Sequence, residues 1–324
     1  MWFPILSALW RSRSEHRPVR RKPASTRLSV EALEDRTVLS TNLFTAASVS
    51  ELIADISKAN QTGGSNTITL EPGVKFTLTT VNNDTDGPTG LPVIAAGDNL
   101  TIVGNGDTIE RSTAKGTPAF RLFDVAAGAS LTAQSLTLQG GLAFGWGVYA
   151  AGGAVYNQGT LTLDGVTIQN NTAQGGDGLN PGFVRNGGTV LGGGLYSIGA
   201  LTVTGSTIQN NSAIGGRGAG AFYYSSDPGA TGSYRVPGAN GGNAFGGGLY
   251  VGGGTVTFSS STILSNTAQG GAGGSSGGNK GQGIGGGIYI DAAAWVGLDG
   301  FTVVRRNHAS TSDNDIFGSY AVIP

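Results

Sequence analysis

The stretch Leu161-Thr-Leu-Asp-Gly-Val-Thr-Ile-Gln-Asn-Asn-Thr-Ala173 decides the fold, because it recurs along the chain. Two close copies are Leu201-Thr-Val-Thr-Gly-Ser-Thr-Ile-Gln-Asn-Asn-Ser-Ala213 and Val256-Thr-Phe-Ser-Ser-Ser-Thr-Ile-Leu-Ser-Asn-Thr-Ala268. A degenerate fourth copy ends in residues 303–309 and aligns only if one extra residue follows Gly300, as a β-bulge supplies. Such self-similarity indicates structural units that stack on one another and bury a common core.

A glycine-rich tyrosine motif alternates with this stretch. Its four copies are Gly152-Gly-Ala-Val-Tyr156, Gly193-Gly-Leu-Tyr196, Gly247-Gly-Leu-Tyr250 and Gly286-Gly-Ile-Tyr289. Each repeat therefore offers three short strands. Without the glycine-rich insertion before the tyrosine motif, a repeat has about two dozen residues, which suits one three-sided coil. We predict an all-β fold, a right-handed parallel β-helix of about six or seven coils.

Stacked coils would align equivalent side chains in ladders. One inward ladder would consist of Ile168, Ile208 and Ile263, and a second of Leu163, Val203 and either Thr257 or Phe258. Asn171, Asn211 and Asn266 would form a ladder at a corner, where each amide can bond to its copy in the next coil. A β-propeller or sandwich would instead show evenly spaced hairpin turns. The return of whole strands after each coil, with insertions always at one corner, favours the solenoid.

Residues 47–60 predict a helix that covers one end of the stack. Ser50 is its expected N-cap, and Leu52, Ile53 and Ile56 form an apolar stripe. The exposed strand edges of a β-stack need such a cover.

Composition divides the chain at about residue 42. Residues 1–40 carry eight Lys/Arg against four Asp/Glu and show no hydrophobic period, so we expect residues 1–42 to be a disordered basic leader. The β-helix is expected over residues 43–324. The remainder after residue 40 carries eleven Lys/Arg against sixteen Asp/Glu, which argues against nucleic acid as a partner. Cysteine is absent, which excludes thiolate metal sites, and no segment approaches the roughly 20 apolar residues of a transmembrane helix.

The insertions, at about 175–192, 215–246 and 270–285 with a shorter one at 140–152, occupy equal positions in their repeats. They should therefore project from one face of the solenoid. Aromatic rings interleaved with arginine suit a carbohydrate or a surface protein as partner. The predicted binding residues are Phe183, Arg185, Phe222, Tyr223, Tyr224, Tyr234 and Arg235. The alternative is that these aromatic side chains fold back and pack on the solenoid.

No pattern predicts catalytic residues, a metal site or a cofactor. Gly175-Gly-Asp-Gly178 lacks the tandem aspartates of calcium-binding repeats. An enzymatic alternative would use carboxylates of the first coils, namely Asp124 with Arg121, or Asp98 with Asp107 and Glu110. Turn capping and solvation explain these residues as well. A C-terminal end cap explains the cluster of Arg305, Arg306, His308, Asp313 and Asp315.

Two resemblances carry the functional expectation. The Gly-Gly-Ala-Val-Tyr and Thr-Ile-x-x-Asn-x-Ala elements resemble the repeats of polymorphic outer-membrane-protein surface β-helices, with isoleucine at Ile168, Ile208 and Ile263 in place of the family's phenylalanine. Leu33-Glu-Asp-Arg-Thr-Val-Leu-Ser40, after a basic stretch, resembles the N-terminal motif of many exported planctomycete proteins. These resemblances imply export and surface display. We expect a non-enzymatic, adhesin-like or structural binding module, with a β-helix polysaccharide lyase or glycoside hydrolase as the alternative.

Overall fold

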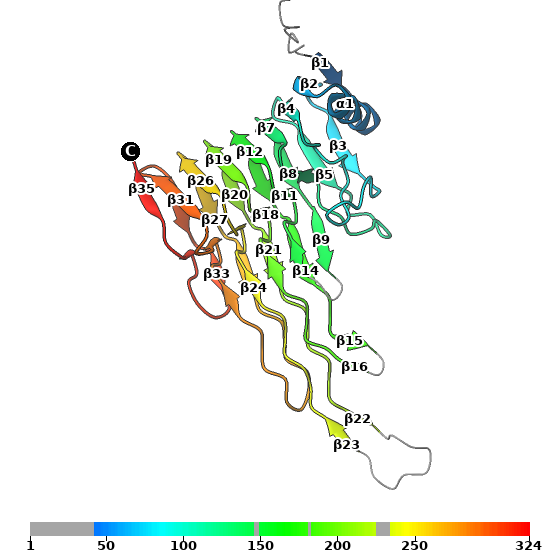
Figure 1. Cartoon of the computed structure of the whole chain (residues 1–324), viewed down its shortest axis with the longest axis vertical. Coiled ribbons are helices and arrows are strands. Elements are labelled where there is room, and N and C mark those ends of the chain that lie inside the picture. Colours follow the sequence, from blue (N-terminus) through cyan, green and yellow to red (C-terminus); the bar gives the residue numbers. More distant parts are fainter. Residues whose placement is uncertain (1–41, 146–148, 181–182, 225–233) are drawn as a thin grey trace, which may run out of the picture. The chain divides into compact units, whose positions relative to one another are not determined.

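Parallel strands build a right-handed β-helix, shown in Figure 1 of a computed structural model. The structure describes residues 42–145, 149–180, 183–224 and 234–324. The chain divides into two units, Met1–Val38 and Leu39–Pro324, and every described residue belongs to the second. The predicted leader therefore lies outside the described residues, apart from Asn42. Because each strand pairs with its own copy in the next coil, the prediction of a parallel β-helix is confirmed.

Three long parallel sheets form what we call the shaft. The first sheet contains, in spatial order, β1 (Asn42–Ala46), β2 (Gly64–Leu70), β4 (Asp98–Val103), β7 (Ser130–Gln134), β12 (Thr160–Asp164), β19 (Ala200–Thr204), β26 (Thr255–Ser259), β31 (Trp295–Asp299) and β35 (Ala321–Ile323). The second contains β3 (Lys75–Leu78), β5 (Thr108–Arg111), β8 (Thr137–Gln139), β13 (Thr167–Gln169), β20 (Thr207–Gln209), β27 (Thr262–Leu264) and β32 (Val303–Arg305). The third contains β6 (Phe123–Val125), β11 (Val155–Asn157), β18 (Leu195–Ser197), β25 (Leu249–Val251), β30 (Ile288–Ile290) and β34 (Ile316–Phe317).

Two shorter parallel sheets lie where the insertions leave and rejoin the coils. The fourth sheet contains β9 (Leu142–Gly145), β14 (Thr172–Gly175), β21 (Ser212–Ile214), β28 (Thr267–Gln269) and β33 (His308–Ala309). The fifth contains β10 (Ala150–Ala151), β17 (Val190–Leu191), β24 (Ala244–Phe245) and β29 (Gly283–Ile284). Two small antiparallel hairpins complete the set, β15 (Leu179–Asn180) with β16 (Phe183–Val184), and β22 (Phe222–Tyr224) with β23 (Tyr234–Val236).

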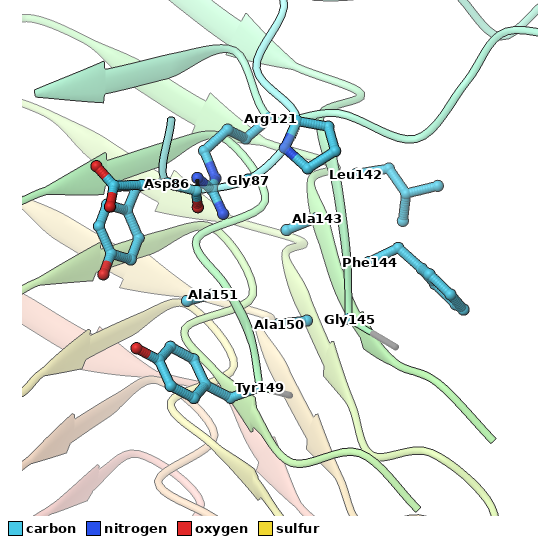
Figure 2. A pocket seen from close by; sticks show the side chains of 12 residues that line it. Asp86, Gly87, Arg121, Leu142, Ala143, Phe144, Gly145, Tyr149, Ala150 and Ala151 are labelled. Atoms are coloured by element: carbon cyan, nitrogen blue, oxygen red, sulfur yellow. Dashed lines mark hydrogen bonds between the residues drawn. The ribbon is translucent and has the colours of Figure 1, made fainter. Parts of the chain in front are cut away.

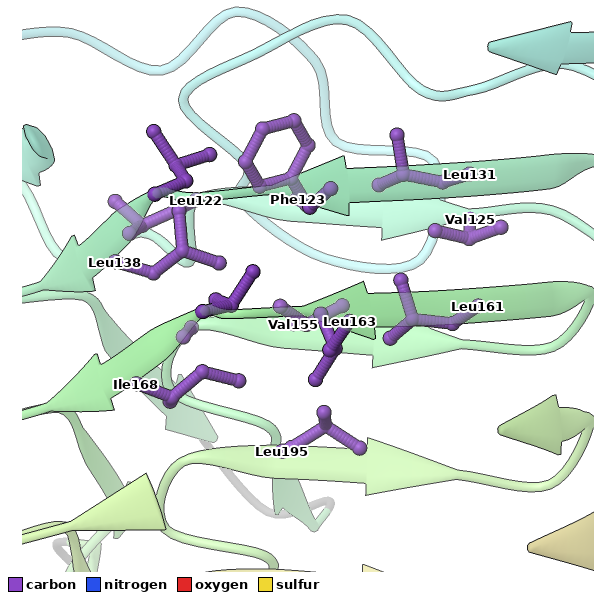
Figure 3. Packing of buried hydrophobic residues seen from close by; sticks show 14 of the residues in the cluster. Leu122, Phe123, Val125, Leu131, Leu138, Val155, Leu161, Leu163, Ile168 and Leu195 are labelled. Carbon is purple, nitrogen blue, oxygen red and sulfur yellow. The ribbon is translucent and has the colours of Figure 1, made fainter. Parts of the chain in front are cut away.

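The predicted apolar ladders fill the core of the shaft. Ile168, Ile208 and Ile263 are in register and buried. In the second ladder Val203 pairs with Phe258 and not with Thr257, so the larger of the two candidates points inward. Figure 3 shows such stacking in an earlier part of the shaft, where Leu131 on β7 lies directly above Leu161 on β12. Alternation along each strand sends every second side chain into this core.

The asparagine ladder is also confirmed and extends one coil beyond the prediction. Side-chain amides of Asn171, Asn211 and Asn266 donate to the Oδ1 atom of the next asparagine at 2.9–3.0 Å, and the last acceptor is Asn307. The left-handed backbone at this corner belongs to the preceding residue, such as Asn170 (φ 54°) and Asn210 (φ 54°), and not to the ladder itself.

The degenerate last repeat contains the extra residue that its sequence requires. Phe258 pairs with Leu298, and Ile263 pairs with Val304. The last coil therefore has one residue more between Leu298 and Val304 than the preceding coil has between Phe258 and Ile263. The expected count of six or seven coils stays a prediction, because the three sheets of the shaft have nine, seven and six strands.

The helix α1 (Val49–Thr62) packs at the end of the shaft beside β1, β2 and β4 (Figure 1). Leu52 and Ile56 are fully buried, and Ile53 packs against the same core. The prediction of Ser50 as N-cap is wrong, because the Ser48 hydroxyl accepts the Glu51 N–H at 3.2 Å. The Glu51 carboxylate in turn accepts the N–H of Ala47 at 2.7 Å, which fixes the helix start two residues earlier.

Candidate functional site

The three long insertions run outward from the fourth sheet and return to the fifth as extended, paired segments (Figure 1). We call these segments the glycine arm: outgoing residues 175–180, 215–224 and 270–275, and returning residues 185–190, 236–244 and 278–283. Where the arm joins the shaft, the fourth and fifth sheets pack through small side chains. This second core consists of Ala143, Ala150, Ala173, Val190, Ala213, Ala244, Ala268 and Ala309.

Backbone hydrogen bonds hold the glycine arm together with a period of three residues. Gly216 and Ala219, three residues apart on an outgoing segment, donate to the returning segment of the previous insertion, at Gly188 and Arg185. Between them, Gly218 donates within the outgoing layer, to Ala272. The returning segment repeats the pattern, with Ala239 and Gly242 bonding across to Ala219 and Gly216 and with Gly241 bonding within its layer. A three-residue period is that of polyproline II, whose backbone leaves every amide free for a neighbour.

Close packing of these segments explains their glycine content. A Cβ atom added to Gly216 would meet the carbonyl oxygen of Gly176, and one added to Gly242 would meet the carbonyl oxygen of Gly188. Only glycine fits where backbones approach this closely, as at the axis of the collagen triple helix.

Polar side chains satisfy backbone amides that face the outside of the arm. Asn186 Oδ1 accepts the N–H of Asn240 at 3.0 Å, and Asn240 Oδ1 accepts the N–H of Asn279 at 2.9 Å. On the outgoing layer, Asp177 accepts the N–H of Arg217 at 2.8 Å. The arm is therefore a hydrogen-bonded structure. Glycine occurs where its backbones pack closely against one another, and polar residues occur where a side chain accepts an amide N–H on the outside.

Most of the predicted binding residues lie at or near the outer end of the arm. Tyr223 pairs with Arg235 and Tyr224 with Tyr234 across the β22–β23 hairpin, while Phe222 pairs with Val236. Phe183 pairs with Asn180 in the β15–β16 hairpin. Arg235 is exposed, and its Nη2 atom donates to the Ser276 carbonyl of the next insertion at 3.3 Å. Arg185 is exposed and starts a returning segment closer to the shaft.

A column of stacked aromatic rings, which the repeat alignment did not single out as a site, lies on the outer side of the third sheet. Centroid separations are 4.8 Å for Tyr156–Tyr196, 5.5 Å for Tyr196–Tyr250, 5.1 Å for Tyr250–Tyr289 and 4.6 Å for Tyr289–Phe317. The tyrosine motif carried this signal, since its tyrosine recurs at one position per coil.

Arg121 and Asp124 end this column on the side of the first coils. The guanidinium carbon of Arg121 lies 4.8 Å from the Tyr156 ring centroid, and its Nη1 atom donates to the Asp86 carbonyl at 2.7 Å. Asp124 is fully buried, and neither carboxylate oxygen accepts a hydrogen bond of ordinary geometry from the described residues. Burial, with the charge of Asp86, raises the pKa of Asp124 to about 6 against the opposing effect of Arg121.

A pocket of about 380 Å³ opens beside Arg121 and Asp86. Figure 2 shows Ala150 and Ala151 between Arg121 and Tyr149, on the side where the fifth sheet begins. Tyr149 also lines a second, more open pocket of about 500 Å³ that includes Arg185, Asn186, Thr189 and Leu191. The structure thus brings one predicted binding residue, Arg185, to a pocket next to the one that contains Arg121.

The other carboxylates of the first coils serve structural roles. Asp98 accepts a hydrogen bond from Asn66 at 2.7 Å, Asp107 accepts the N–H of Gly73 at 2.7 Å, and Glu110 forms an ion pair with Lys75 at 2.9 Å. Each is thus occupied by a different partner. At the other end, Asp315 accepts from both nitrogens of Asn307 at 2.9–3.1 Å and terminates the asparagine ladder. Within the described ranges, no group of three His, Cys, Asp or Glu residues is placed to hold a metal ion.

No protein-family model matches the chain, and no curated protein or solved structure shows significant similarity to it. Over the residues that the structure describes, no helix has the length and apolar character to cross a membrane.

Proposed function

We propose that this β-helix is an exported or surface-displayed binding protein, adhesin-like and without catalytic activity, that contacts a carbohydrate or a protein of another surface. The observation that carries the proposal is the glycine arm. Its segments are bonded to one another through backbone amides at every turn of the three-residue period, so the hairpins at its end are held out on a supported structure. A preorganised display element loses less conformational entropy on binding than a free loop does.

The sequence resemblances support the location. The repeats resemble surface β-helices of the polymorphic outer-membrane-protein kind, and residues 33–40 resemble a planctomycete export motif. The basic character of the first 40 residues contrasts with the acidic remainder, which suits a leader whose role differs from that of the shaft.

Replacing residues 222–236 by two glycines in the full-length protein tests the role of the arm. We expect adhesion to native cells and binding to a glycan array to fall strongly, while the melting temperature stays unchanged. The matched control is Phe301→Ala, which removes an aromatic ring that is 80% exposed and lies away from the arm. Full binding by the shortened protein would refute the proposed role of the hairpin residues. Fractionation of native cells, with antibody detection of the protein in each fraction, tests the location. Detection in the cytosolic fraction would refute surface display.

Polysaccharide cleavage is the second candidate, favoured by one observation. Asp124 has a pKa raised to about 6 and interacts with Arg121, which lines a pocket, and an acid that titrates near neutral pH suits general acid–base catalysis. Against this, both Asp124 oxygens are buried and the residue does not line the pocket. Release of reducing ends or unsaturated products from pectin or alginate, abolished by Asp124→Asn, would replace the binding proposal by the enzymatic one.

A further inference from the structure

We propose that the two pockets that share Tyr149 bind an acidic oligosaccharide, with one sugar ring in the Arg121 pocket and a carboxylate of the neighbouring unit against Arg185. This inference rests on the proposed binding function and names its ligand class and a second location for it, at the base of the arm instead of its end.

The Arg185 pocket has the character of an anion site. Among the residues that the structure describes, its lining contains Arg185 and the polar residues Asn186 and Thr189, but no acidic side chain. Arg185 is exposed, and among the described residues it takes part in no ion pair. Most described Lys and Arg side chains form no ion pair, so what distinguishes Arg185 is its place in the lining of a pocket. The planar guanidinium matches a carboxylate in bidentate geometry.

The Arg121 pocket has a different character, because its positive charge is already compensated. Burial lowers the pKa of the Arg121 guanidinium, and the nearby carboxylates of Asp124 and Asp86 act in the opposite direction, so negative charge already surrounds this cation. What remains is a pocket with tyrosine side chains, an exposed carboxylate at Asp86 and an alanine floor. Sugar hydroxyls pair with such a carboxylate, while the apolar face of a sugar ring packs on an aromatic ring.

Tyr149 connects the two pockets and is accessible to a ligand. Its side chain is 53% exposed, and it lines both pockets. The volumes of about 380 and 500 Å³ each lie in the range of about 300–1,000 Å³ that is typical of small-ligand pockets. A chain of linked sugars can therefore occupy both pockets by passing over Tyr149.

The backbone around Arg185 is fixed before any ligand arrives. The Arg185 carbonyl accepts the N–H of Ala219 at 3.1 Å, and the Asn186 side chain accepts the N–H of Asn240 at 3.0 Å. These bonds reach into the next insertion. The backbone that carries the guanidinium is thereby held in place, so binding does not have to order the main chain at this position.

Calorimetric titration of the full-length protein with a hyaluronan tetramer, in which uronic acid and neutral sugar units alternate, tests this inference, with neutral chitotetraose as the comparison. We expect the acidic tetramer to bind more tightly and to lose affinity with added salt, as an exposed ion pair does. Arg185→Gln should weaken binding of the acidic tetramer about fivefold, the upper range for one exposed ion pair, and leave the weaker binding of the neutral tetramer unchanged. Tyr149→Ala should weaken both. Lys280→Gln is the charge-matched control on the exposed side of the arm and should change neither.

Three results would overturn the inference: no binding of either tetramer, equal affinity for both, or an equal loss in the Lys280→Gln protein, which would show unspecific attraction to charge. Replacement of residues 222–236 at the end of the arm distinguishes failure of this inference from failure of the proposed binding function. If neither tetramer binds but replacement of residues 222–236 still abolishes surface binding, the acidic-sugar site is refuted and the binding function stands. If the acidic tetramer binds as expected and that replacement has no effect, the acidic-sugar site stands and the role of the hairpin residues in surface binding is refuted.

Discussion

Asp124 on β6 is the direct parallel neighbour of Tyr156 on β11, in the column that is aromatic in every later coil through Phe317. An acidic residue therefore ends a stack of rings, and the guanidinium of Arg121 lies over the first ring beside it. A buried charge is tolerated at this place because Arg121 partly compensates it. The raised pKa of Asp124 shows that the compensation is incomplete.

Stability should therefore depend on pH through Asp124. Its carboxyl has an ordinary pKa of 3.8 and a folded-state pKa of about 6, so the folded protein binds the extra proton in this interval. The contribution is fully present below about pH 4 and is lost as the pH rises through about 6. Asp124→Asn should remove this dependence and raise stability at pH 8 relative to pH 4 by on the order of 3 kcal/mol, measured as the difference from the unaltered protein in urea unfolding.

Asp86→Asn provides the accompanying control. Removing the neighbouring negative charge should lower the pKa of Asp124 and shift the pH dependence downward without abolishing it. An unchanged pH profile in Asp124→Asn would show that this carboxyl is not the group that titrates.

Asn211 should contribute more to stability than the neighbouring Asn210. Its Nδ2 atom donates to the Ile168 carbonyl and to Asn266, both at 3.0 Å, and its Oδ1 atom accepts from Asn171. Asn211→Ala leaves these buried groups without partners and should lower the free energy of unfolding by at least about 2 kcal/mol. Asn210 is exposed with φ 54°, so Asn210→Gly should cost little. Equal effects of the two changes in chemical denaturation would contradict the structural role of the ladder.

How far the sequence predicts this structure depends on whether a residue repeats. Ile208, Val203 and Asn211 recur once per coil, and their inward positions follow from the alignment alone. The N-cap does not repeat, and a local signal decides it: Glu51 stands three residues after Ser48, as in a capping box, and its carboxylate accepts the N–H of Ala47, whereas the residue three after Ser50 is Ile53. The glycine arm was expected as loops that share a face. Its order could not be predicted, since the three-residue period appears only when the segments of different insertions are paired.

The candidate site shows the same division. The tyrosine column follows from the repeated tyrosine motif, but the pocket beside it is lined by Asp86 and Arg121 from the irregular first coils and by Tyr149 from the shortest insertion. None of these three residues repeats, so no alignment within the chain brings them together.

Ile208→Asp should unfold the shaft. Ile208 is buried between Ile168 and Ile263, and an aspartate there has neither water nor a cation as partner. Burial of an unpaired charge costs several kcal/mol. Ile208→Val keeps the ladder and should cost only about 0.5–1.5 kcal/mol. Thermal unfolding followed by circular dichroism measures both, and an unchanged melting temperature in Ile208→Asp would show that the ladder does not lie in the core.

Shortening the longest insertion by deleting residues 217–240 should leave the shaft folded but unpair the outer half of the arm. Loop length by itself costs little. The deletion, however, removes the acceptor of the Gly178 N–H, which is the Arg217 carbonyl, and the acceptor of the Gly274 N–H, which is the Ala239 carbonyl. The inner bonds from Gly188 to Gly176 and from Gly271 to Gly242 remain. Amide hydrogen exchange should therefore become fast at Gly178 and Gly274, stay slow at Gly188 and Gly271, and stay slow throughout the shaft.

Replacement of residues 222–236 alone is the control, because it keeps all four of these bonds and should keep all four amides protected. Loss of protection throughout the shaft after the longer deletion would mean that the arm stabilises the β-helix, and uniform protection at Gly178 and Gly274 would mean that the arm segments do not depend on one another.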